Sequence, residues 1–315
     1  MAGGSIRTVL GDVSPESLGA TDCHEHLFQV SPLLPGDELD DPERSEAEAA
    51  SLAASGFGAM IDATPIGLGR RSAELARISA ATGLGVVAAT GVHREAHYAD
   101  DHPLRALDAA ARAERFVREL QQGLPVADDD DRPAHGPDGA PVRAGVVKTG
   151  IGYWSISAFE RATLDAAAAA HRAVGAPVMV HLEFCTAAHE VLDLLADAGV
   201  PAERVMLAHA DRDPDAGLHL ELMARGAWLG YDGMARARTR SDGELLDLTA
   251  EVVAAGGTRI LLGGDVARAT RYLAYGGMPG LEYLGRRYLP RLAKRLGDDV
   301  VRGILVTNPR EFLAF

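Results

Sequence analysis

Two histidines separated by a single residue, His24 and His26, are the first feature of the sequence that could bind a metal ion. They follow a short apolar run, and on a β-strand alternate side chains point to the same face. Two neutral imidazoles on one face can chelate one divalent metal ion. A pair with this spacing also arises by chance in a chain with 11 histidines, so the prediction depends on what the later strands carry.

Four later residues of the kinds that metal hydrolases use each stand at the end of a strand-like apolar run. They are Lys148, His181, His209 and Asp265. One such residue alone is more often a hydrogen-bonded polar group of the core. Together with the histidine pair they make a set of six, which is better explained by one shared site, provided that the fold brings the strand ends together.

The segments that carry these residues alternate between short apolar strands and helices. Runs such as residues 178–180 and 260–262 are apolar throughout, which is typical of parallel strands buried on both faces. The alternation predicts an α/β fold, a (β/α)8 barrel made by residues 1–315 as a single domain, with a doubly wound open sheet as the alternative. The expected strands span residues 19–26, 58–63, 85–90, 144–148, 177–181, 204–209, 227–231 and 259–265.

Three other segments complete the predicted arrangement. Residues 5–10 form a short strand that could close the bottom of the barrel, and residues 104–122 form one helix. The acidic segment 126–141, rich in Pro and Gly, is expected to be a solvated loop or hairpin.

A barrel would gather the six residues, because its active site lies at the C-terminal ends of the strands. Four neutral histidines and one aspartate could hold two divalent metals, but they balance a charge of +4 only weakly. An ammonium on Lys148 would be repelled by the metals. If Lys148 reacts with CO₂, it becomes an anionic carbamate that can bridge two metals and lower the net charge of the site.

The order of these motifs resembles the phosphotriesterase family of the amidohydrolase superfamily, including its lactonase branches. The chain has His-Xaa-His, then Lys in VVKTG, His in PVMVH, His in LAHAD and Asp in GGDVAR, and it ends in TNPREF at 307–312. The likeness covers nearly the whole chain. It implies a centre of two divalent metals, usually zinc. His24, His26 and Asp265 would bind one metal, His181 and His209 the other, and Lys148, as N6-carboxylysine, would bridge them.

Residues 265–280 resemble the branch of this family that acts on sugar lactones, some of them phosphorylated. In that branch, basic and tyrosyl residues after strands seven and eight hold the phosphate, and Arg238, Arg268 and Tyr275 stand at these positions. The branch has a tyrosine where this chain has Arg271.

Arginines are also crowded in the loops after the seventh and eighth predicted strands. Arg236, Arg238 and Arg240 follow the seventh, and Arg268 and Arg271 follow the eighth. In barrels these two loops often form a phosphate site. We predict that Arg238, Arg268 and Tyr275 bind a phosphate or carboxylate of the substrate, while pairing of the arginines with nearby surface carboxylates is the alternative interpretation.

Several further residues have less specific interpretations. His93, His97 and Tyr98 follow the third predicted strand and are expected to line the substrate pocket. Strict alternation along the first strand predicts that Cys23 and Glu25 point away from the metal-binding histidines, towards the helices. His219 is expected to be a surface or packing residue of a helix.

The leading hypothesis is a metal-dependent hydrolase that opens a lactone, with sugar lactones and phosphorylated sugar lactones as candidate substrates. A metal-bridging hydroxide would attack the carbonyl carbon, and Asp265 would take its proton and pass it to the leaving alkoxide. The alternatives are a phosphotriesterase, a Schiff-base aldolase that uses Lys148, and a metal-binding protein without catalysis. The aldolase leaves the histidines unexplained, and aromatic residues, at 5%, are few for an organophosphate pocket.

Composition limits the partners. The chain of 315 residues has a net charge of −14, which argues against binding to nucleic acid or an anionic membrane. It has two cysteines, and its N-terminus lacks the apolar stretch of a signal peptide, so the expected location is the cytoplasm. The expected partner is a small-molecule substrate, and the resemblance leaves a homodimer open.

Overall fold

Eight parallel strands, paired in the order in which the chain forms them, make the centre of the computed structural model, which describes residues 4–315. The first and last strands meet where the backbone N–H of Asp265 donates to the carbonyl of His24 at 2.8 Å, so the sheet closes on itself. The predicted (β/α)8 barrel is confirmed, and the open sheet is excluded. The strands are β3 (Thr21–Glu25), β4 (Ala59–Asp62), β5 (Gly85–Gly91), β8 (Val146–Gly150), β9 (Val178–His181), β10 (Val205–Ala208), β11 (Trp228–Tyr231) and β12 (Ile260–Leu262).

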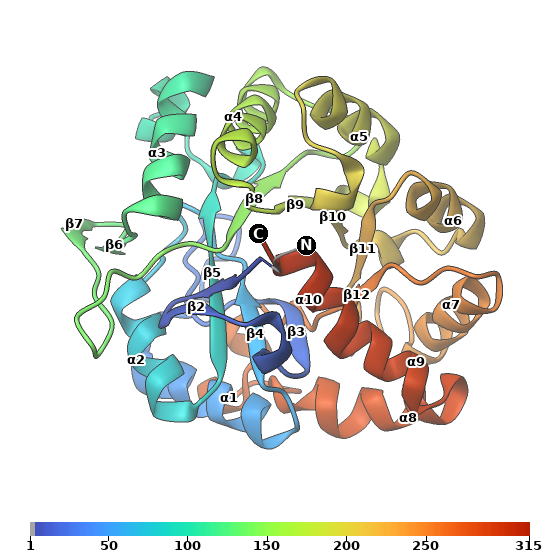
Figure 1. The fold of residues 1–315 in the computed structure, drawn as a ribbon. Coiled ribbons are helices and arrows are strands. Elements are labelled where there is room, and N and C mark those ends of the chain that lie inside the picture. The colour runs from blue at the N-terminus through green and yellow to red at the C-terminus, as the bar shows by residue number, and fades with distance from the viewer. Residues whose placement is uncertain (1–3) are drawn as a thin grey trace.

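Helices surround this barrel on its outer face (Figure 1). Their ends follow the sequence closely. For example, Ser157 and Glu160 form a capping box at the start of α4, and Gly175, in the left-handed conformation, ends it. The α-helices are α1 (Pro42–Ala54), α2 (Ser72–Thr82), α3 (Ala109–Gln121), α4 (Ala158–Val174), α5 (Ala188–Asp197), α6 (Ala216–Ala224), α7 (Asp242–Ala254), α8 (Leu289–Leu296), α9 (Asp298–Arg302) and α10 (Asn308–Leu313).

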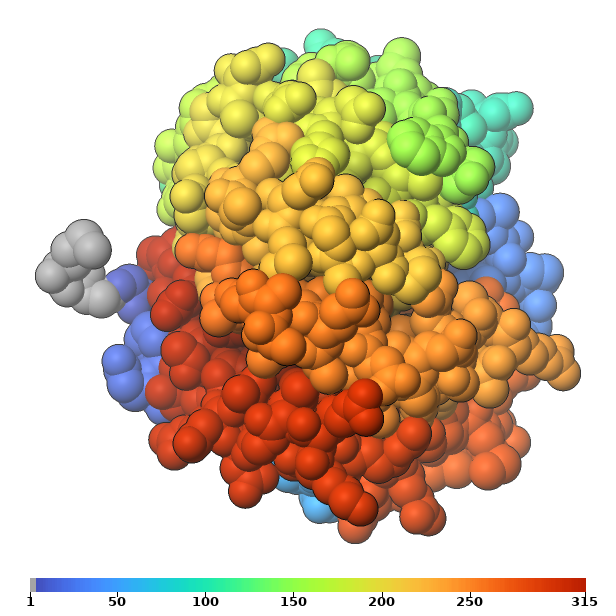
Figure 2. Space-filling model, turned by 90° about the vertical axis from the view of Figure 1, so that its right-hand side faces the viewer, coloured from blue at the N-terminus to red at the C-terminus, as the bar shows by residue number. Residues whose placement is uncertain are grey.

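On the side of α6, α7 and α8 the outer layer is a continuous packed surface, with successive segments stacked in chain order from yellow to red (Figure 2). Short 3-10 turns connect many of the elements. Among the described residues, no helix has the length and apolar character needed to cross a membrane.

Two predicted segments differ in detail from the structure. The helix expected at 104–122 is divided into a 3-10 turn, Pro103–Ala106, and α3, because Asp108 caps the N-terminus of α3 by accepting from the backbone N–H of Ala111 at 2.9 Å. The segment 126–141 contains most of a hairpin of β6 (Pro125–Ala127) and β7 (Asp130–Pro133), as the hairpin option predicted.

The bottom of the barrel is closed by both ends of the described chain. Residues 5–10, expected as one strand, form β1 (Ile6–Thr8), which pairs with β2 (Gly11–Val13) as an antiparallel hairpin. Ile6 packs with the interior side chains of the barrel, and Ser5 forms two backbone hydrogen bonds with Phe315. The two ends of the described chain accordingly lie side by side at the barrel axis in Figure 1. The opposite end remains open for a site.

A β-bulge in β3 changes which side chains face the inside of the barrel. The register of β3 against β4 shifts between Asp22 and Glu25. As a result, Cys23 packs in the interior cluster with Ile61, while the next residue, His24, also points inward. The expectation that Cys23 points towards the helices is therefore wrong. Strict alternation fails at a bulge because one extra residue is inserted into the strand.

Candidate metal centre and substrate pocket

A pocket of about 460 Å³ opens at the C-terminal ends of the strands and is lined by five of the six predicted ligands. The five are His24, His26, His181, His209 and Asp265. The sixth, Lys148, is fully buried, and its Nζ lies 3.2 Å from the Nε2 of His24. The structure therefore brings all six residues to one end of the barrel.

The first group of ligands consists of His24, His26 and Asp265. The Nε2 atoms of the two histidines lie 3.8 and 3.6 Å from Oδ1 of Asp265. Thr64 fixes the orientation of His26: its hydroxyl donates to the carbonyl of Phe28, so its oxygen can accept from Nδ1 of His26 at 2.8 Å. That hydrogen bond leaves the lone pair on Nε2 of His26, which faces Asp265, free for a metal.

The second group consists of His181 and His209, whose facing nitrogens, Nδ1 and Nε2, are only 2.7 Å apart. A carboxylate holds the other nitrogen of each ring. Nε2 of His181 lies 3.0 Å from Glu183, and Nδ1 of His209 lies 2.6 Å from Asp232. These contacts place the proton of each neutral ring on its outer nitrogen and point the lone pair of the inner nitrogen at the shared space.

Asp232 connects the two groups, and the sequence analysis missed it. One carboxylate oxygen accepts from Nδ1 of His24 at 2.9 Å, and the other accepts from Nδ1 of His209. Asp232 directly follows the apolar strand β11, just as the predicted ligands end their strands. That position was the available signal, because the seventh strand was the one late strand without an assigned polar residue.

Burial keeps His24, His181 and His209 neutral. It lowers the pKa of His24 to about 3, helped by the charge of Lys148, and it also lowers the pKa of His181 and His209. Burial likewise lowers the pKa of Lys148 to about 8. Burial opposes the ionisation of Asp265, but Arg236 and the histidines outweigh it and hold the pKa of this carboxyl well below its usual range.

This donor set fits divalent metal ions. Imidazole nitrogens and carboxylate oxygens bind zinc at about 2.0–2.2 Å, so ligand atoms roughly 3–4 Å apart can share one ion. The separations in the first group have this size. In the second group two lone pairs converge, an arrangement that is repulsive by itself and that a cation relieves. Lys148 lies beside the first group and its charge is also felt by His181.

The predicted substrate-binding residues divide into two sets. His93 and Arg268 line the pocket, although the Arg268 side chain is 47% exposed and lies 3.9 Å from Asp37. Arg238 is exposed and lies outside the pocket lining. Tyr275 is also outside, because its hydroxyl bonds to Ser45 and to the backbone of Asp41 at the start of α1.

Tyr98 supports the pocket from behind without lining it. Its hydroxyl accepts from the backbone N–H of His93 and donates to the carbonyl of Ile66, both at 2.9 Å. Tyr98 thus positions His93. The structure corrects the expected placement of Tyr98, Tyr275 and Arg238, since hydrogen bonds to the scaffold or exposure take these side chains away from the cavity.

Four arginines line the pocket, namely Arg94, Arg212, Arg236 and Arg268. Arg212 lies 3.3 Å from Oδ2 of Asp265, and Arg236 pairs with the same carboxylate. Arg271, from the predicted arginine cluster, is mostly buried and donates to the backbone carbonyls of Asp265 and Met234. Of the crowded arginines, Arg236 and Arg268 therefore face the pocket, and Arg271 supports its wall.

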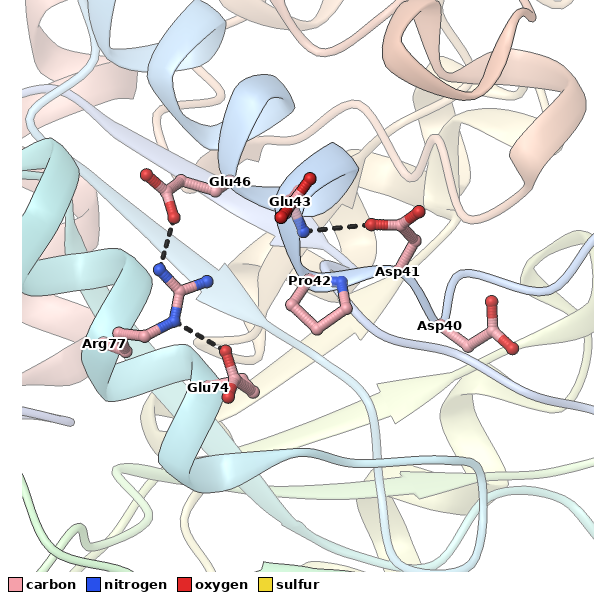
Figure 3. Close-up of a pocket in the computed structure, with 7 residues that line it drawn as sticks. All are labelled: Asp40, Asp41, Pro42, Glu43, Glu46, Glu74 and Arg77. Atoms are coloured by element: carbon pink, nitrogen blue, oxygen red, sulfur yellow. Dashed lines mark hydrogen bonds and ion pairs between the residues drawn. The ribbon is translucent and has the colours of Figure 1, made fainter.

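A larger cleft, of about 840 Å³, lies on the outside between α1 and α2 (Figure 3). Its lining is mostly acidic, and its only arginine, Arg77, is already paired with Glu46 and Glu74. This cleft lacks histidines and strand ends, so the chemistry of the molecule is assigned to the barrel mouth.

Comparison with known proteins gives consistent matches over nearly the entire chain. Residues 4–313 match the phosphotriesterase family. A phospho-furanose lactonase of Mycoplasmopsis agalactiae is 30% identical over 98% of this chain and 91% of its own. A lactonase from Listeria monocytogenes has a TM-score of 0.88 at 30% identity, covering 99% of both chains. The phosphotriesterase homology protein from Escherichia coli, with phosphate in its active site, has a TM-score of 0.83 at 26% identity, over 94% of this chain and 99% of that one.

Proposed function

Because this chain belongs to the phosphotriesterase family and is a hydrolase, we propose that it opens the ring of a lactone that carries an anionic group such as phosphate. One observation carries the proposal: a convergent set of metal-type ligands shares one pocket with four arginine side chains. Relatives named as a phospho-furanose lactonase and a lactonase support the choice of a lactone.

We propose that the centre holds two divalent metal ions, with zinc as the expected metal. His24, His26 and Asp265 would bind one ion, and His181 and His209 the other. Lys148, as N6-carboxylysine, would bind both. When bound, such ions supply Lewis acidity and a hydroxide nucleophile at neutral pH.

The side chains of this chain perform the remaining steps. Asp265 lies within reach of both ligand groups, so it can accept a proton from the nucleophile and deliver it to the leaving alkoxide. With the carboxylate of Asp265 serving as a metal ligand, Arg236 and Arg212, which pair with it in this structure, would be available to bind an anion. Arg268, at the open rim of the pocket, can also bind a phosphate through two parallel hydrogen bonds from its guanidinium group.

Metal content tests the centre. We expect metal-loaded protein to contain two equivalents of metal per chain, and a chelator to abolish lactone hydrolysis. At most one equivalent in fully loaded protein would refute the binuclear proposal. Trapping of a covalent adduct with substrate and borohydride would instead favour the aldolase.

A substrate screen tests the reaction. The set should contain a phosphorylated furanose lactone, a neutral lactone of the same ring size, a phosphotriester and an anionic amide. We expect the phosphorylated lactone to react fastest. A preference for the phosphotriester would favour a phosphotriesterase instead. The pocket lining contains no Phe, Tyr or Trp, which argues against an apolar organophosphate pocket.

Arg268→Ala tests the anion grip. We expect a loss of about 2 kcal/mol in kcat/KM on the phosphorylated lactone, the scale of a hydrogen bond to a charged group, and little change on the neutral one. Arg238→Ala is the matched control, because Arg238 lies outside the pocket. Equal losses on both lactones would mean that Arg268 supports the loop and does not read an anion.

A further inference from the structure

His93 and His97 form a stacked pair in the wall of the pocket, and the mechanism above does not use them. Their ring centroids are 4.0 Å apart, and both residues line the cavity. Neither Nε2 atom has a hydrogen-bond partner among residues 4–315. Both atoms keep some accessible surface, because neither belongs to the fully buried polar atoms that lack a partner in this part of the chain. Both Nε2 atoms therefore reach the open space of the pocket.

The backbone fixes the tautomer of His93. The backbone N–H of Arg94 donates to Nδ1 of His93 at 2.7 Å. A backbone amide is always a donor, so Nδ1 must carry a lone pair and the ring proton must lie on Nε2. His93 consequently presents an N–H group to the pocket. An Nε2–H cannot coordinate a metal, which argues against a third ligand group at this position.

Ser31 gives His97 the same tautomer. The Ser31 hydroxyl oxygen accepts from the backbone N–H of Leu33 at 3.2 Å and lies 2.9 Å from Nδ1 of His97. Within the described chain this nitrogen is the one acceptor for the hydroxyl proton of Ser31, which is 3% exposed. Donation from Ser31 to Nδ1 satisfies that buried proton and places the ring proton of His97 on Nε2.

The pair faces Arg236 across the pocket, whereas Arg94, next to His93, is paired with Glu183 at 3.1 Å. His93 and His97 follow β5, the third strand of the barrel, whereas Arg236 follows β11, the seventh, which lies diametrically opposite. The ring of His93 also packs 4.6 Å from that of His181, a ligand of the second group. A substrate whose anionic group is bound by Arg236 would direct the other end of its ring at the Nε2–H groups of His93 and His97.

We propose that His93 and His97 form a specificity subsite of two fixed N–H donors, which binds a hydroxyl oxygen on the lactone ring and so selects hydroxylated over deoxygenated lactones. This inference deepens the proposed function and rests on it for the identity of the reaction. The arrangement of the donors does not require that the molecule bound be hydrolysed. Because the donors are fixed before binding, recognition needs no rearrangement of either ring.

The tautomers can be measured without any substrate. In zinc-loaded protein labelled with nitrogen-15 in histidine, we expect both His93 and His97 to show protonated Nε2 and unprotonated Nδ1. Spectra of His93→Gln and His97→Gln assign the signals. The exposed His135, whose Nδ1 lies 3.0 Å from the carbonyl of Pro133 and so carries the ring proton, serves as a reference for the opposite tautomer. A proton on Nδ1 of His93 would overturn the proposal.

A pair of lactones tests the recognition. The probes are a phosphorylated furanose lactone and its deoxy analogue, which lacks one ring hydroxyl. We expect His93→Leu to lose about 10-fold in kcat/KM on the hydroxylated probe, the scale of one neutral hydrogen bond, and at most about 2-fold on the deoxy probe. His93→Gln, which retains an amide N–H, should recover most of the loss, and His135→Gln should behave as wild type. Equal losses on both probes would overturn the subsite.

Binding separates this inference from the proposed function. If the wild type hydrolyses neither lactone, the proposed reaction fails, but calorimetry with the two ring-opened hydroxy-acid phosphates still measures the subsite. We expect His93→Leu to weaken binding of the hydroxylated acid by about 10-fold and to leave the deoxy acid nearly unchanged. If His93→Leu does not fold, Ser31→Ala, which releases the tautomer of His97, should reduce the same preference. An unchanged preference in every soluble variant would refute the proposal.

Discussion

Two clusters of buried charged side chains occur in this molecule, and they are organised in opposite ways. One is the ligand set at the barrel mouth. The other surrounds Arg70, which lies only 4% exposed between α2, α3 and the β6–β7 hairpin. Both include residues from strand ends and loops, and both would be expensive to bury without compensation.

In the Arg70 cluster each charge meets its complement. Arg70 donates to Glu119 at 2.8 Å and to Asp128 at 3.1 Å. Glu119 also accepts from Thr90 and Arg115, and Asp128 accepts from three backbone N–H groups of the β4–α2 loop. This closed network holds the hairpin and α3 against the barrel. Within residues 4–315 it leaves no buried side-chain atom of Arg70, Glu119 or Asp128 without a hydrogen-bond partner.

At the mouth, atoms that can bind a metal converge. Lone pairs of His181 and His209 point at each other, and the lone pair on Nε2 of His24 meets the amine of Lys148. Nearby, Oδ2 of Asp22 has no hydrogen-bond partner within residues 4–315, and burial raises the pKa of this carboxyl to about 8. The comparison teaches that a buried cluster whose polar groups satisfy one another is structural. A cluster whose metal-ligating atoms converge without satisfying one another is a ligand site.

Lys148→Ala gives the largest expected effect on this comparison. Removing the group proposed to bind both metals should lower kcat by about 1000-fold or more, the several kcal/mol that metal catalysis supplies, and should reduce metal content. Stability without metal should change little, because burial disfavours the charged amine and its hydrogen-bond partner within residues 4–315 is Nε2 of His24 alone. Short carboxylic acids should restore part of the activity. A high-resolution map of metal-loaded wild type with an uncoordinated, unmodified Lys148 would contradict the carbamate.

Glu119→Gln should show the opposite phenotype. Breaking this buried pair should lower the free energy of unfolding by about 3 kcal/mol, since the charge of Arg70 loses its closest partner. Metal content and kcat of the folded fraction should remain near wild type. Glu74→Gln is the control, because its pairing with Arg77 is on the surface and should contribute only about 0.5 kcal/mol. Denaturant titration measures both, and equal effects would erase the distinction between the pairs.

Asp232→Asn sharpens the comparison within the mouth. Asp232 touches no metal in the proposed centre, but it orients His24 and His209. Loss of such a supporting carboxylate typically weakens metal binding by about 10–100-fold. Competition with a chelator of known affinity measures the change. Asp128→Asn, which alters a carboxylate of the closed cluster, should reduce stability without changing metal affinity, and a shared loss of affinity would count against the positioning role.

Acid stability provides the smallest test. Burial opposes the ionisation of Glu119, but Arg70 outweighs it and lowers the pKa of this carboxyl below its ordinary value of 4.5. Its stabilising effect is therefore complete above the unfolded pKa and is lost as the pH falls through the folded pKa, at about 1.4 kcal/mol per unit of lowering. The stability difference between wild type and Glu119→Gln should shrink as the pH falls below the ordinary pKa of 4.5. A constant difference would show that Glu119 acts through packing.

The barrel and the convergence of the ligands could be predicted from the sequence because both depend on local pattern. Apolar runs separated by helices define parallel strands, and in a closed barrel all strand ends meet at one face. Lys148, His181, His209 and Asp265 needed no further information to be placed together. The family resemblance then supplied expectations about metals and substrate that the strand pattern alone did not contain.

What only the tertiary structure decided lies where backbone irregularity or distant contacts set a direction. The bulge in β3 turned Cys23 inward, against strict alternation. Arg236 lines the pocket and Arg238 does not. The sequence could not predict this, because a loop has no regular period that tells which side chain points inward. Asp232 bridges residues far apart in the chain, and the tautomers of His93 and His97 depend on single hydrogen bonds from Arg94 and Ser31. Sequence periodicity determines which face of a strand a residue occupies. The particular atom that it presents is determined by neighbours that only the folded chain brings into contact.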